Sequence, residues 1–199
     1  MYPLVETIKM YNGQIYRLKL HQKRMDTSYK AVFGQENPFL LHRLIKVPPA
    51  FTKGLVKIRF LYDRKDADIR FEHYRPKIIR TLKIVCDDNI SYSHKYTERK
   101  IFDRLLLQKG DCDDILIVKQ GLITDTSIAN IAFYDPSSGR WVTPAVPLLK
   151  GVCREARLQK DLHEEIITVA DLHRYDRAVL LNAMICDQPP VVAIENIII

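Results

Sequence analysis

DDILIVKQGLITDTSIANIAF, residues 113–133, is the stretch around which the fold of this 199-residue chain is organised. Its apolar first half, which ends at Gly121, predicts a strand that stops at a glycine turn. Residues 128–135 (IANIAFYD) predict another strand, followed by a turn at 136–139. Between these strands, residues 124–127 predict a polar edge that carries hydroxyl and carboxylate side chains.

The sequence on either side of this stretch alternates between helical and strand patterns. Residues 98–108 and 151–162 have helical patterns, and residues 177–184 form a continuous apolar run typical of a buried strand. This alternation predicts a larger mixed β domain with helices over residues 79–199. Further expected elements are strands at 81–88, 140–144 and 165–168 and a helical turn at 171–175.

The first third of the chain has the pattern of antiparallel strands. Asn12-Gly13 separates two short β-type runs, and both residues tolerate the positive φ of a hairpin turn. Residues 20–34 then predict a helix that a glycine ends, and a weaker helix follows Asn37 with Pro38 at its first position. Together with strands these helices predict a small α+β domain over residues 1–78. The expected strands are 4–10, 14–18, 54–63 and 68–76.

The composition, with 47% hydrophobic and 28% charged residues, is that of a soluble globular protein. The apolar runs are too short to cross a bilayer, and the first residues do not resemble a signal peptide. The net charge of +7 comes without a recognisable nucleic-acid module. We therefore expect a cytoplasmic protein that attracts a small anionic substrate and binds neither nucleic acid nor a membrane.

The cysteines and histidines show no spacing typical of a metal site. The cysteines are far apart in the sequence, which predicts four reduced thiols in a cytoplasmic protein. They are Cys86, Cys112, Cys153 and Cys186. The chain also lacks a GxGxxG loop, a Walker loop and a GxSxG nucleophile elbow.

Lys95 is a candidate nucleophile because His94, Tyr96 and Arg99 lie near it in the sequence and a helix is expected after it. A neighbouring cation and partial burial both lower the pKa of a lysine, which favours the neutral amine that Schiff-base chemistry needs. The alternative is an ordinary surface lysine. The residues alone leave both interpretations open.

Asp125 is the candidate carboxylate of the central stretch. One interpretation is a turn aspartate that bonds its own backbone. The other is a carboxylate held inside the protein, where it could keep a bound pyridine ring protonated and electron-accepting. Thr126 and Ser127 offer hydroxyl and N–H groups on the same segment.

Gly151 precedes an expected helix whose first N–H groups belong to Val152 and Cys153. Helix N-termini bind phosphate, although every helix has one, so the signal is not specific. Arg24, three residues after His21 on the first expected helix, could add a bidentate grip on the same phosphate. The alternative is a solvated helix arginine.

Five segments, taken in order, resemble the class IV (fold-type IV) pyridoxal-phosphate enzymes. This family includes branched-chain and D-amino-acid aminotransferases and 4-amino-4-deoxychorismate lyase. The resemblance covers nearly the whole chain and implies an α/β fold of two domains, a small antiparallel-sheet domain plus a larger mixed β domain. The segments are 5–25 (ETI strand, NG hairpin and HxxR helix), 94–99 (HKYTER), 113–133, 143–154 (TPAVPLLKGVCR) and 180–184 (LLNAM).

The resemblance also implies roles for individual residues. Lys95 would hold the cofactor covalently and then move a proton, and Asp125 would pair with the pyridine nitrogen, where the family usually has glutamate. The family places the cofactor in the cleft between its two domains, in a homodimer. The phosphate would be held by Arg24, by Thr126, Ser127 and Ile128, and by the backbone of Val152 and Cys153.

LLNAM is similar to the corresponding segment of the lyases. This similarity favours a lyase that converts 4-amino-4-deoxychorismate to 4-aminobenzoate and pyruvate, in the synthesis of a folate precursor. Thr7 is a candidate hydroxyl donor for that reaction, the alternative being a packing or solvent-facing threonine. Two other functions stay open, a class IV aminotransferase for branched-chain or D-amino acids and an inactive homologue. Because the sequence starts directly at the ETI strand, the resemblance also implies a shortened N-terminus.

Overall fold

The computed structural model describes residues 2–199 and forms two compact units. Unit 1 contains Met1–Pro76 and His94–Glu98, and unit 2 contains Lys77–Ser93 and Arg99–Ile199. The expected α/β architecture, with one small antiparallel sheet and one larger mixed sheet, is confirmed. The sequence suggested a single domain boundary after residue 78, whereas in the structure His94–Glu98 also belongs to unit 1.

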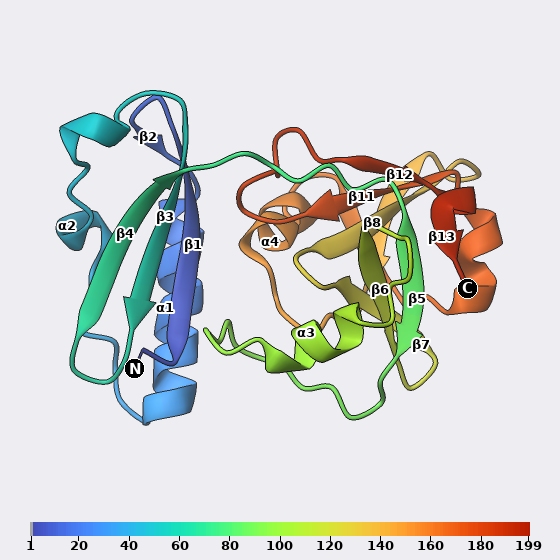
Figure 1. Cartoon of the computed structure of the whole chain (residues 1–199), viewed down its shortest axis with the longest axis horizontal. Helices are drawn as coiled ribbons and strands as arrows, with labels where there is room; N and C mark the ends of the chain where they lie inside the picture. Colours follow the sequence, from blue (N-terminus) through green and yellow to red (C-terminus); the bar gives the residue numbers. More distant parts are fainter. Residues whose placement is uncertain (1) are drawn as a thin grey trace. The chain divides into compact units, whose positions relative to one another are not determined.

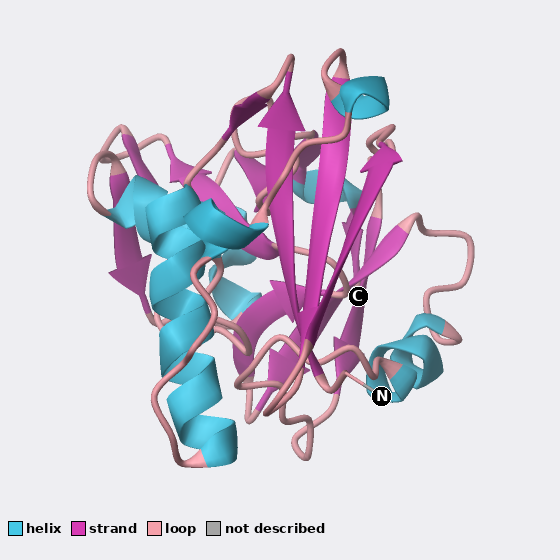
Figure 2. Cartoon of the chain, turned by 90° about the vertical axis from the view of Figure 1, so that its left-hand side faces the viewer, coloured by secondary structure: helices cyan, strands magenta, loops and turns pink. Residues whose placement is uncertain are grey.

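Unit 1 is a four-stranded antiparallel sheet with the order β2-β1-β3-β4, and α1 packs along one face of it (Figures 1 and 2). The strands are β1 (Leu4–Tyr11), β2 (Gln14–Ile15), β3 (Leu55–Tyr62) and β4 (Ala67–His73), and the helices are α1 (Leu18–Phe33), α2 (Leu41–Leu44) and the 3-10 turn η1 (Pro49–Phe51). Ile8 and Met10 of β1 share a buried core with Met25 and Tyr29 of α1. Because alternate strand residues share a face, Glu6 lies on this apolar side of β1.

The turns of unit 1 lie where the sequence predicts them. Asn12 and Gly13 have φ values of 47° and 79°, which confirms the predicted hairpin. Gly34, with φ of 70°, ends α1 and donates its N–H to the carbonyl of Lys30 at 2.9 Å. A residue with a Cβ would be strained in this left-handed conformation, so the glycine fixes where the helix stops.

Unit 2 is built on a nine-stranded mixed sheet whose main order is β10-β9-β8-β7-β6-β5-β13, with β11 pairing with β8 and β12. The strands are β5 (Leu82–Cys86), β6 (Asp114–Lys119), β7 (Leu122–Thr126), β8 (Asn130–Asp135), β9 (Arg140–Pro144), β10 (Leu162–Glu165), β11 (Arg177–Leu181), β12 (Val191–Ala193) and β13 (Ile197–Ile198). The helices are α3 (Lys100–Leu106), α4 (Val152–Leu158) and the 3-10 segments η2 (Val169–Arg174) and η3 (Ile194–Asn196). β6 and β8 are buried along almost their whole length, as expected for strands inside a sheet.

Two predicted helices are shorter in the structure. After Asn37 only Leu41–Leu44 is helical, because the Asn37 side-chain oxygen accepts the N–H of Phe39 at 3.0 Å and forms a local turn instead. The helix expected over 151–162 ends at Leu158, and Leu162–Glu165 pairs with β9 as a parallel strand. In both places a hydrogen bond formed by folding outweighs the helical pattern.

Cys153 and Cys186 form a disulfide within unit 2, so the prediction of four reduced cysteines is wrong for this pair. The first turn of α4 and the segment after β11 bring the two residues together from 33 positions apart. Both side chains are buried in a cluster that includes Leu181. Cys86 and Cys112 are free, as predicted. Sequence spacing detects local cysteine pairs and cannot show that distant strands and helices will meet.

Candidate active site

Asp125 lies in β7, a strand that the sequence did not predict. The pairing between β6 and β7 shifts register between Leu116 and Val118, which leaves one extra residue on β7 between Ile123 and Thr126. Such a bulge re-aims the side chains beside it. The bulge therefore sets the direction of the Asp125 carboxylate, which is buried.

Uncharged groups hold the Asp125 carboxylate. Asn130 Nδ2 donates to Oδ1 at 2.7 Å, and the backbone N–H of Leu149 donates to Oδ2 at 2.9 Å. Burial raises the pKa of Asp125 to about 6, against these hydrogen bonds, which lower it. The carboxylate is therefore mostly ionised at neutral pH. Because a carboxylate has about four acceptor positions, it can also bond a cationic group.

Asn130 ties Asp125 to the loop before α4. Its amide lies opposite Asp125 in the β7–β8 pair and donates a second hydrogen bond to the carbonyl of Leu149 at 2.8 Å. A Cβ built on Gly151 would lie 2.0 Å from Asn130 Oδ1, so only glycine fits there. Sequence reasoning missed Asn130, although an amide five residues after the carboxylate, on the next strand, was the available signal.

The turn at residues 126–129 is closed by its own hydrogen bonds. Thr126 N–H donates to the carbonyl of Ala129 at 2.8 Å, and Thr126 Oγ1 accepts the N–H of Ala129 at 3.1 Å. Ser127 is buried, and its carbonyl accepts a hydrogen bond from Arg99. Ile128 is 39% exposed. The Thr126 hydroxyl is therefore part of the turn itself, and Ile128 is its outward-facing member.

α4 begins at Val152, and the Val152 and Cys153 side chains are both buried. Their N–H groups belong to the first turn, where helical N–H groups have no partner inside the helix. Arg154, the next residue, is buried and donates to the Pro144 carbonyl at 2.9 Å and to Glu164 at 2.5 Å. Its positive charge contributes to lowering the pKa of the nearby Asp125 carboxyl. The buried Arg154 thus forms an ion pair next to the start of α4.

In unit 1, Lys95 lies beside the N-terminal half of β1. Leu4 and Tyr96 form an antiparallel bridge, and Val5 N–H donates to the carbonyl of Lys95 at 3.0 Å. Thr7 is the next residue after Val5 on that face of the strand. It faces away from Glu6 and α1. Lys95 and Thr7 therefore both lie along the N-terminal half of β1, although the charge of Lys95 acts on His21, on the α1 side of the strand.

Arg24 is a partner in a buried ion pair and not a solvated helix arginine. Its Nε and Nη2 donate to Glu6 Oε1 and Oε2 at 2.9 and 2.6 Å, and its side chain is 13% exposed. His21 Nδ1 lies 2.6 Å from the same Oε2. Sequence reasoning proposed Arg24 and missed Glu6 and His21. The HxxR spacing was the signal, since residues three apart share a helix face.

The pKa values of this cluster show which members are charged. Burial acts to raise the pKa of Glu6, but the charge of Arg24 and the hydrogen bond from His21 outweigh it and lower the pKa to about 2. Burial lowers the pKa of His21, and the charges of Arg24 and Lys95 lower it further, against the effect of Glu6. Glu6 is therefore an anion, and His21 is a neutral imidazole whose Nδ1 donates.

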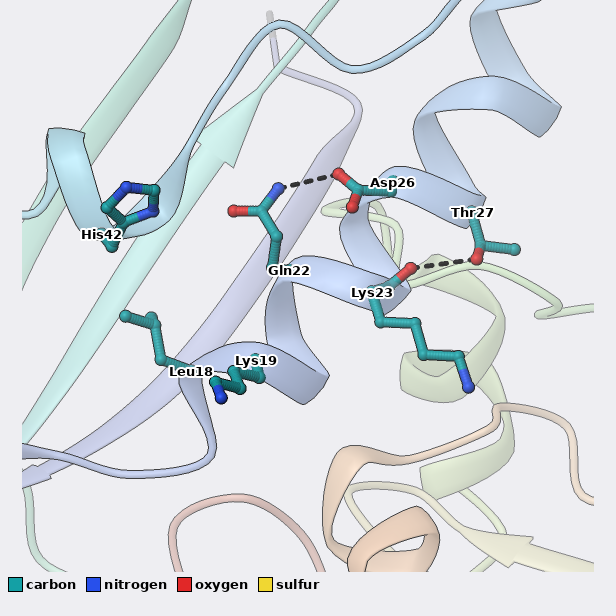
Figure 3. A pocket seen from close by; sticks show the side chains of 7 residues that line it. All are labelled: Leu18, Lys19, Gln22, Lys23, Asp26, Thr27 and His42. Carbon is teal, nitrogen blue, oxygen red and sulfur yellow. Dashed lines mark hydrogen bonds between the residues drawn. The ribbon is translucent and has the colours of Figure 1, made fainter.

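A separate pocket of about 630 Å³ lies against α1 and α2 of unit 1 (Figure 3). It is lined by Leu18, Lys19, Gln22, Lys23, Asp26, Thr27 and His42. None of the residues proposed from the sequence lines it. Within residues 2–199, no three His, Cys, Asp or Glu side chains are grouped as a metal site. No helix in the same range is long and apolar enough to span a membrane.

Comparison with known proteins decides the family. The model of the family described as amino-transferase class IV matches residues 3–189. The chain belongs to the class IV aminotransferase family, a family of enzymes. The resemblance inferred from the five sequence segments is thereby confirmed.

Relatives of this class IV protein match most of its length. An uncharacterised protein of Haemophilus influenzae is 37% identical over 187 residues, which are 92% of this chain and 98% of the relative. A crystal structure from Haemophilus somnus 129pt, of a protein provisionally named 4-amino-4-deoxychorismate lyase, is 35% identical with a TM-score of 0.86 and covers 92% of this chain and 97% of that one. The PLP-bound form of a hypothetical aminotransferase from Mycobacterium tuberculosis has the same fold, with a TM-score of 0.80, 16% identity and coverage of 96% and 80%.

Proposed function

We propose that this class IV protein is a pyridoxal-phosphate-dependent lyase that converts 4-amino-4-deoxychorismate to 4-aminobenzoate and pyruvate. The observation that carries the proposal is the match to the Haemophilus somnus protein provisionally given that name, at 35% identity over 97% of its chain. The local geometry of each unit supports a cofactor of this kind.

In unit 2, the residues present fit the ring of pyridoxal phosphate. Asp125 is buried, has a raised pKa and is held by uncharged donors, so a cationic nitrogen would complete its environment. Gly151 has no room for a Cβ because the Asn130 side chain fills that position, so the glycine lets the loop before α4 lie against the residue that holds Asp125. The phosphate contacts of unit 2 would come from Thr126, Ser127, Ile128 and the N–H groups of Val152 and Cys153.

Unit 1 would supply the amine and one more phosphate contact. Lys95 is fixed beside β1 through its carbonyl, which accepts the N–H of Val5. Arg24 presents a guanidinium group whose orientation Glu6 determines. These are the two residue types that a Schiff base and a phosphate require.

Pyridoxal phosphate, when bound, supplies a conjugated ring that accepts electrons from the carbon next to the substrate's amino group. The Lys95 amine would take the proton from that carbon. Asp125, ionised above about pH 6, would hold a proton on the pyridine nitrogen. The Thr7 hydroxyl would donate a proton to the departing enolpyruvyl group, which leaves as pyruvate, while the proton that Lys95 removes balances this donation and the ring becomes aromatic.

The LLNAM stretch, whose similarity to the lyases favours this assignment, is held in place by Asn182. Its Nδ2 donates to the carbonyl of Ile128 at 3.3 Å, and its Oδ1 accepts the N–H of Met184 at 2.9 Å. The stretch is thus anchored to the turn that we propose for the phosphate. A side chain in this position can set the shape of the site without taking part in the chemistry.

The test is to incubate the purified protein with pyridoxal phosphate and 4-amino-4-deoxychorismate, with no keto acid present. We expect equal amounts of pyruvate and 4-aminobenzoate. An aminotransferase would instead need an added keto-acid acceptor, and an inactive homologue would form no product with or without one. Borohydride reduction followed by peptide mapping should place the cofactor on Lys95.

The family resemblance motivates two further proposals about the protein in solution. We propose a homodimer, which sedimentation equilibrium would measure, and a cytoplasmic location, which fractionation of the source cells would measure. The net charge of +7 suits a small dicarboxylate substrate. Raising the ionic strength should therefore weaken substrate binding more than it weakens the binding of a neutral analogue.

A further inference from the structure

We propose that Glu6 and His21 are positioning residues, which fix the Arg24 guanidinium in the orientation that binds a phosphate group. The assignment rests on the proposed function, because the phosphate in question is that of the cofactor. Neither residue reacts with or touches the substrate in this proposal. Their role is to act through Arg24.

The geometry determines one orientation of the guanidinium. Glu6 lies on the apolar face of β1, and both oxygens of its carboxylate accept hydrogen bonds. Oε1 accepts Arg24 Nε at 2.9 Å, and Oε2 accepts both Arg24 Nη2 and His21 Nδ1 at 2.6 Å. A rotated guanidinium would lose one of the two parallel hydrogen bonds. The Nε–Nη2 edge therefore belongs to Glu6, and a phosphate would bond the other edge.

Charge alone does not account for this arrangement. Glu6 is ionised and cancels the charge of Arg24, while His21 is neutral. An isolated arginine would attract a phosphate more strongly than a neutralised pair does. The buried carboxylate is therefore better explained by orientation than by attraction.

His21 fixes the carboxylate in turn. Its ring is buried, and among the described residues its Nε2 has no hydrogen-bond partner. A buried acceptor without a partner costs free energy, so the polar contribution of the ring lies in its Nδ1 bond to Glu6. Without that bond the Glu6 carboxylate could rotate, and the Arg24 guanidinium that it holds could rotate with it.

The test is to titrate the full-length protein with pyridoxal phosphate and, separately, with pyridoxal, which lacks the phosphate. We expect Glu6→Gln to weaken pyridoxal phosphate binding by about ten- to one-hundred-fold, the effect of losing hydrogen bonds to a charged group, and to leave pyridoxal binding unchanged. Glu6→Asp keeps the charge and withdraws the carboxylate, so it should also weaken binding. Glu36→Gln, an exposed glutamate of the same unit, is the matched control.

A double-mutant cycle separates positioning from charge. If Glu6 acts only through Arg24, Glu6→Gln should have no effect on the Kd in an Arg24→Ala background. Tighter or unchanged pyridoxal phosphate binding by Glu6→Gln, or a loss that persists without Arg24, overturns the positioning role. Circular dichroism checks that each variant is folded, and His21→Gln, which should give a smaller loss of the same kind, replaces Glu6→Gln should that variant unfold. A wild-type protein that binds neither ligand overturns the proposed function together with this assignment, whereas normal wild-type binding with an unaffected Glu6→Gln overturns the assignment alone.

Discussion

Glu6 in unit 1 and Asp125 in unit 2 are both buried carboxylates, yet their pKa values move in opposite directions. Cationic and hydrogen-bonding partners overcome burial at Glu6 and lower its pKa to about 2. At Asp125 the partners are an amide and a backbone N–H, and burial raises the pKa to about 6. Equal burial therefore has unequal consequences, because the charge of the partner decides which form is stable.

The difference separates a completed charge pair from an incomplete one. Glu6 already has its cation in Arg24, and its carboxylate fixes the Arg24 guanidinium within unit 1. Asp125 is oriented by uncharged donors, and the charge of Arg154 does not offset its burial. This suits a site whose positive group arrives with a ligand. Perturbed carboxylates of the second kind concentrate at functional sites.

Among the proposed substitutions, replacement of Lys95 should have the largest effect, because neither carboxylate can supply its amine. Lys95→Ala should remove turnover and the borohydride-fixed cofactor completely. It should change the free energy of unfolding by no more than about 1 kcal/mol, since a half-buried lysine on a strand edge contributes little to stability. Pyruvate release and urea unfolding measure the two effects, with Lys23→Ala as the control. Full activity in Lys95→Ala would remove Lys95 from the mechanism.

Neutralising the two carboxylates should affect different properties. Glu6→Gln leaves the largely buried Arg24 without its counter-ion and should lower the free energy of unfolding by about 3–5 kcal/mol. Asp125→Asn keeps an acceptor and removes an uncompensated charge, so stability at pH 8 should be unchanged or higher while turnover falls. Urea unfolding of both variants makes the comparison. A larger stability loss in Asp125→Asn than in Glu6→Gln would contradict it.

Unit 2 also differs from unit 1 in having a disulfide, Cys153–Cys186. A bond that closes a loop of 33 residues restricts the unfolded chain, and its loss should lower the free energy of unfolding of unit 2 by about 3–4 kcal/mol. Denaturation of Cys186→Ser, or of the wild type with dithiothreitol, measures this. Cys86→Ser should have no such effect. Equal stability with and without reductant would show that the two thiols are unlinked in solution.

The opposite pKa shifts predict opposite pH dependences of stability. Folded Glu6 binds a proton less tightly than its ordinary pKa of 4.5 implies, so stability is lost as the pH falls from 4.5 to about 2. Folded Asp125 binds a proton more tightly than its ordinary 3.8 implies, so stability is lost as the pH rises from 3.8 to about 6. Each effect amounts to about 3 kcal/mol. Unfolding measured from pH 2 to 8 should lose the first dependence in Glu6→Gln and the second in Asp125→Asn.

The smallest effect should come from the backbone beside Asp125. In Gly151→Ala the new Cβ displaces the Asn130 side chain, because it would lie 2.0 Å from Oδ1. We expect stability to fall by about 1–2 kcal/mol and pyridoxal phosphate affinity to fall with it, since Asn130 orients the carboxylate. Asn130→Ala should cause a similar loss, and the double variant should be little worse than either. Simple addition of the two losses would show that Gly151 acts independently of Asn130.

Local patterns predicted the parts of the fold that local forces determine. The Asn12-Gly13 turn, the end of α1 at Gly34 and the buried strand β11 depend on φ preferences and on apolar periodicity, and all three are in the structure. β7 was missed, because its polar residues Thr124 and Asp125 interrupt the apolar pattern of a buried strand. Their burial depends on hydrogen bonds to Ile117 and Asn130, which come from other strands.

The same distinction between local patterns and distant contacts applies to the candidate site. The sequence identified Arg24 and Asp125 from their motifs, but no role was assigned to Glu6 or Asn130, which determine how those two side chains are held. The residues with a proposed direct role belong to family motifs, whereas the residues that orient them were identified by their contacts in the structure.

By itself the sequence determined the family, the order of the elements and the reactive residue types, because spacing and periodicity are properties of the chain. Only the tertiary structure decided that Glu6 meets Arg24, that Asp125 has uncharged partners and that Cys153 reaches Cys186. The physical reason is that a pKa, an ion pair or a disulfide depends on which distant groups burial brings into contact.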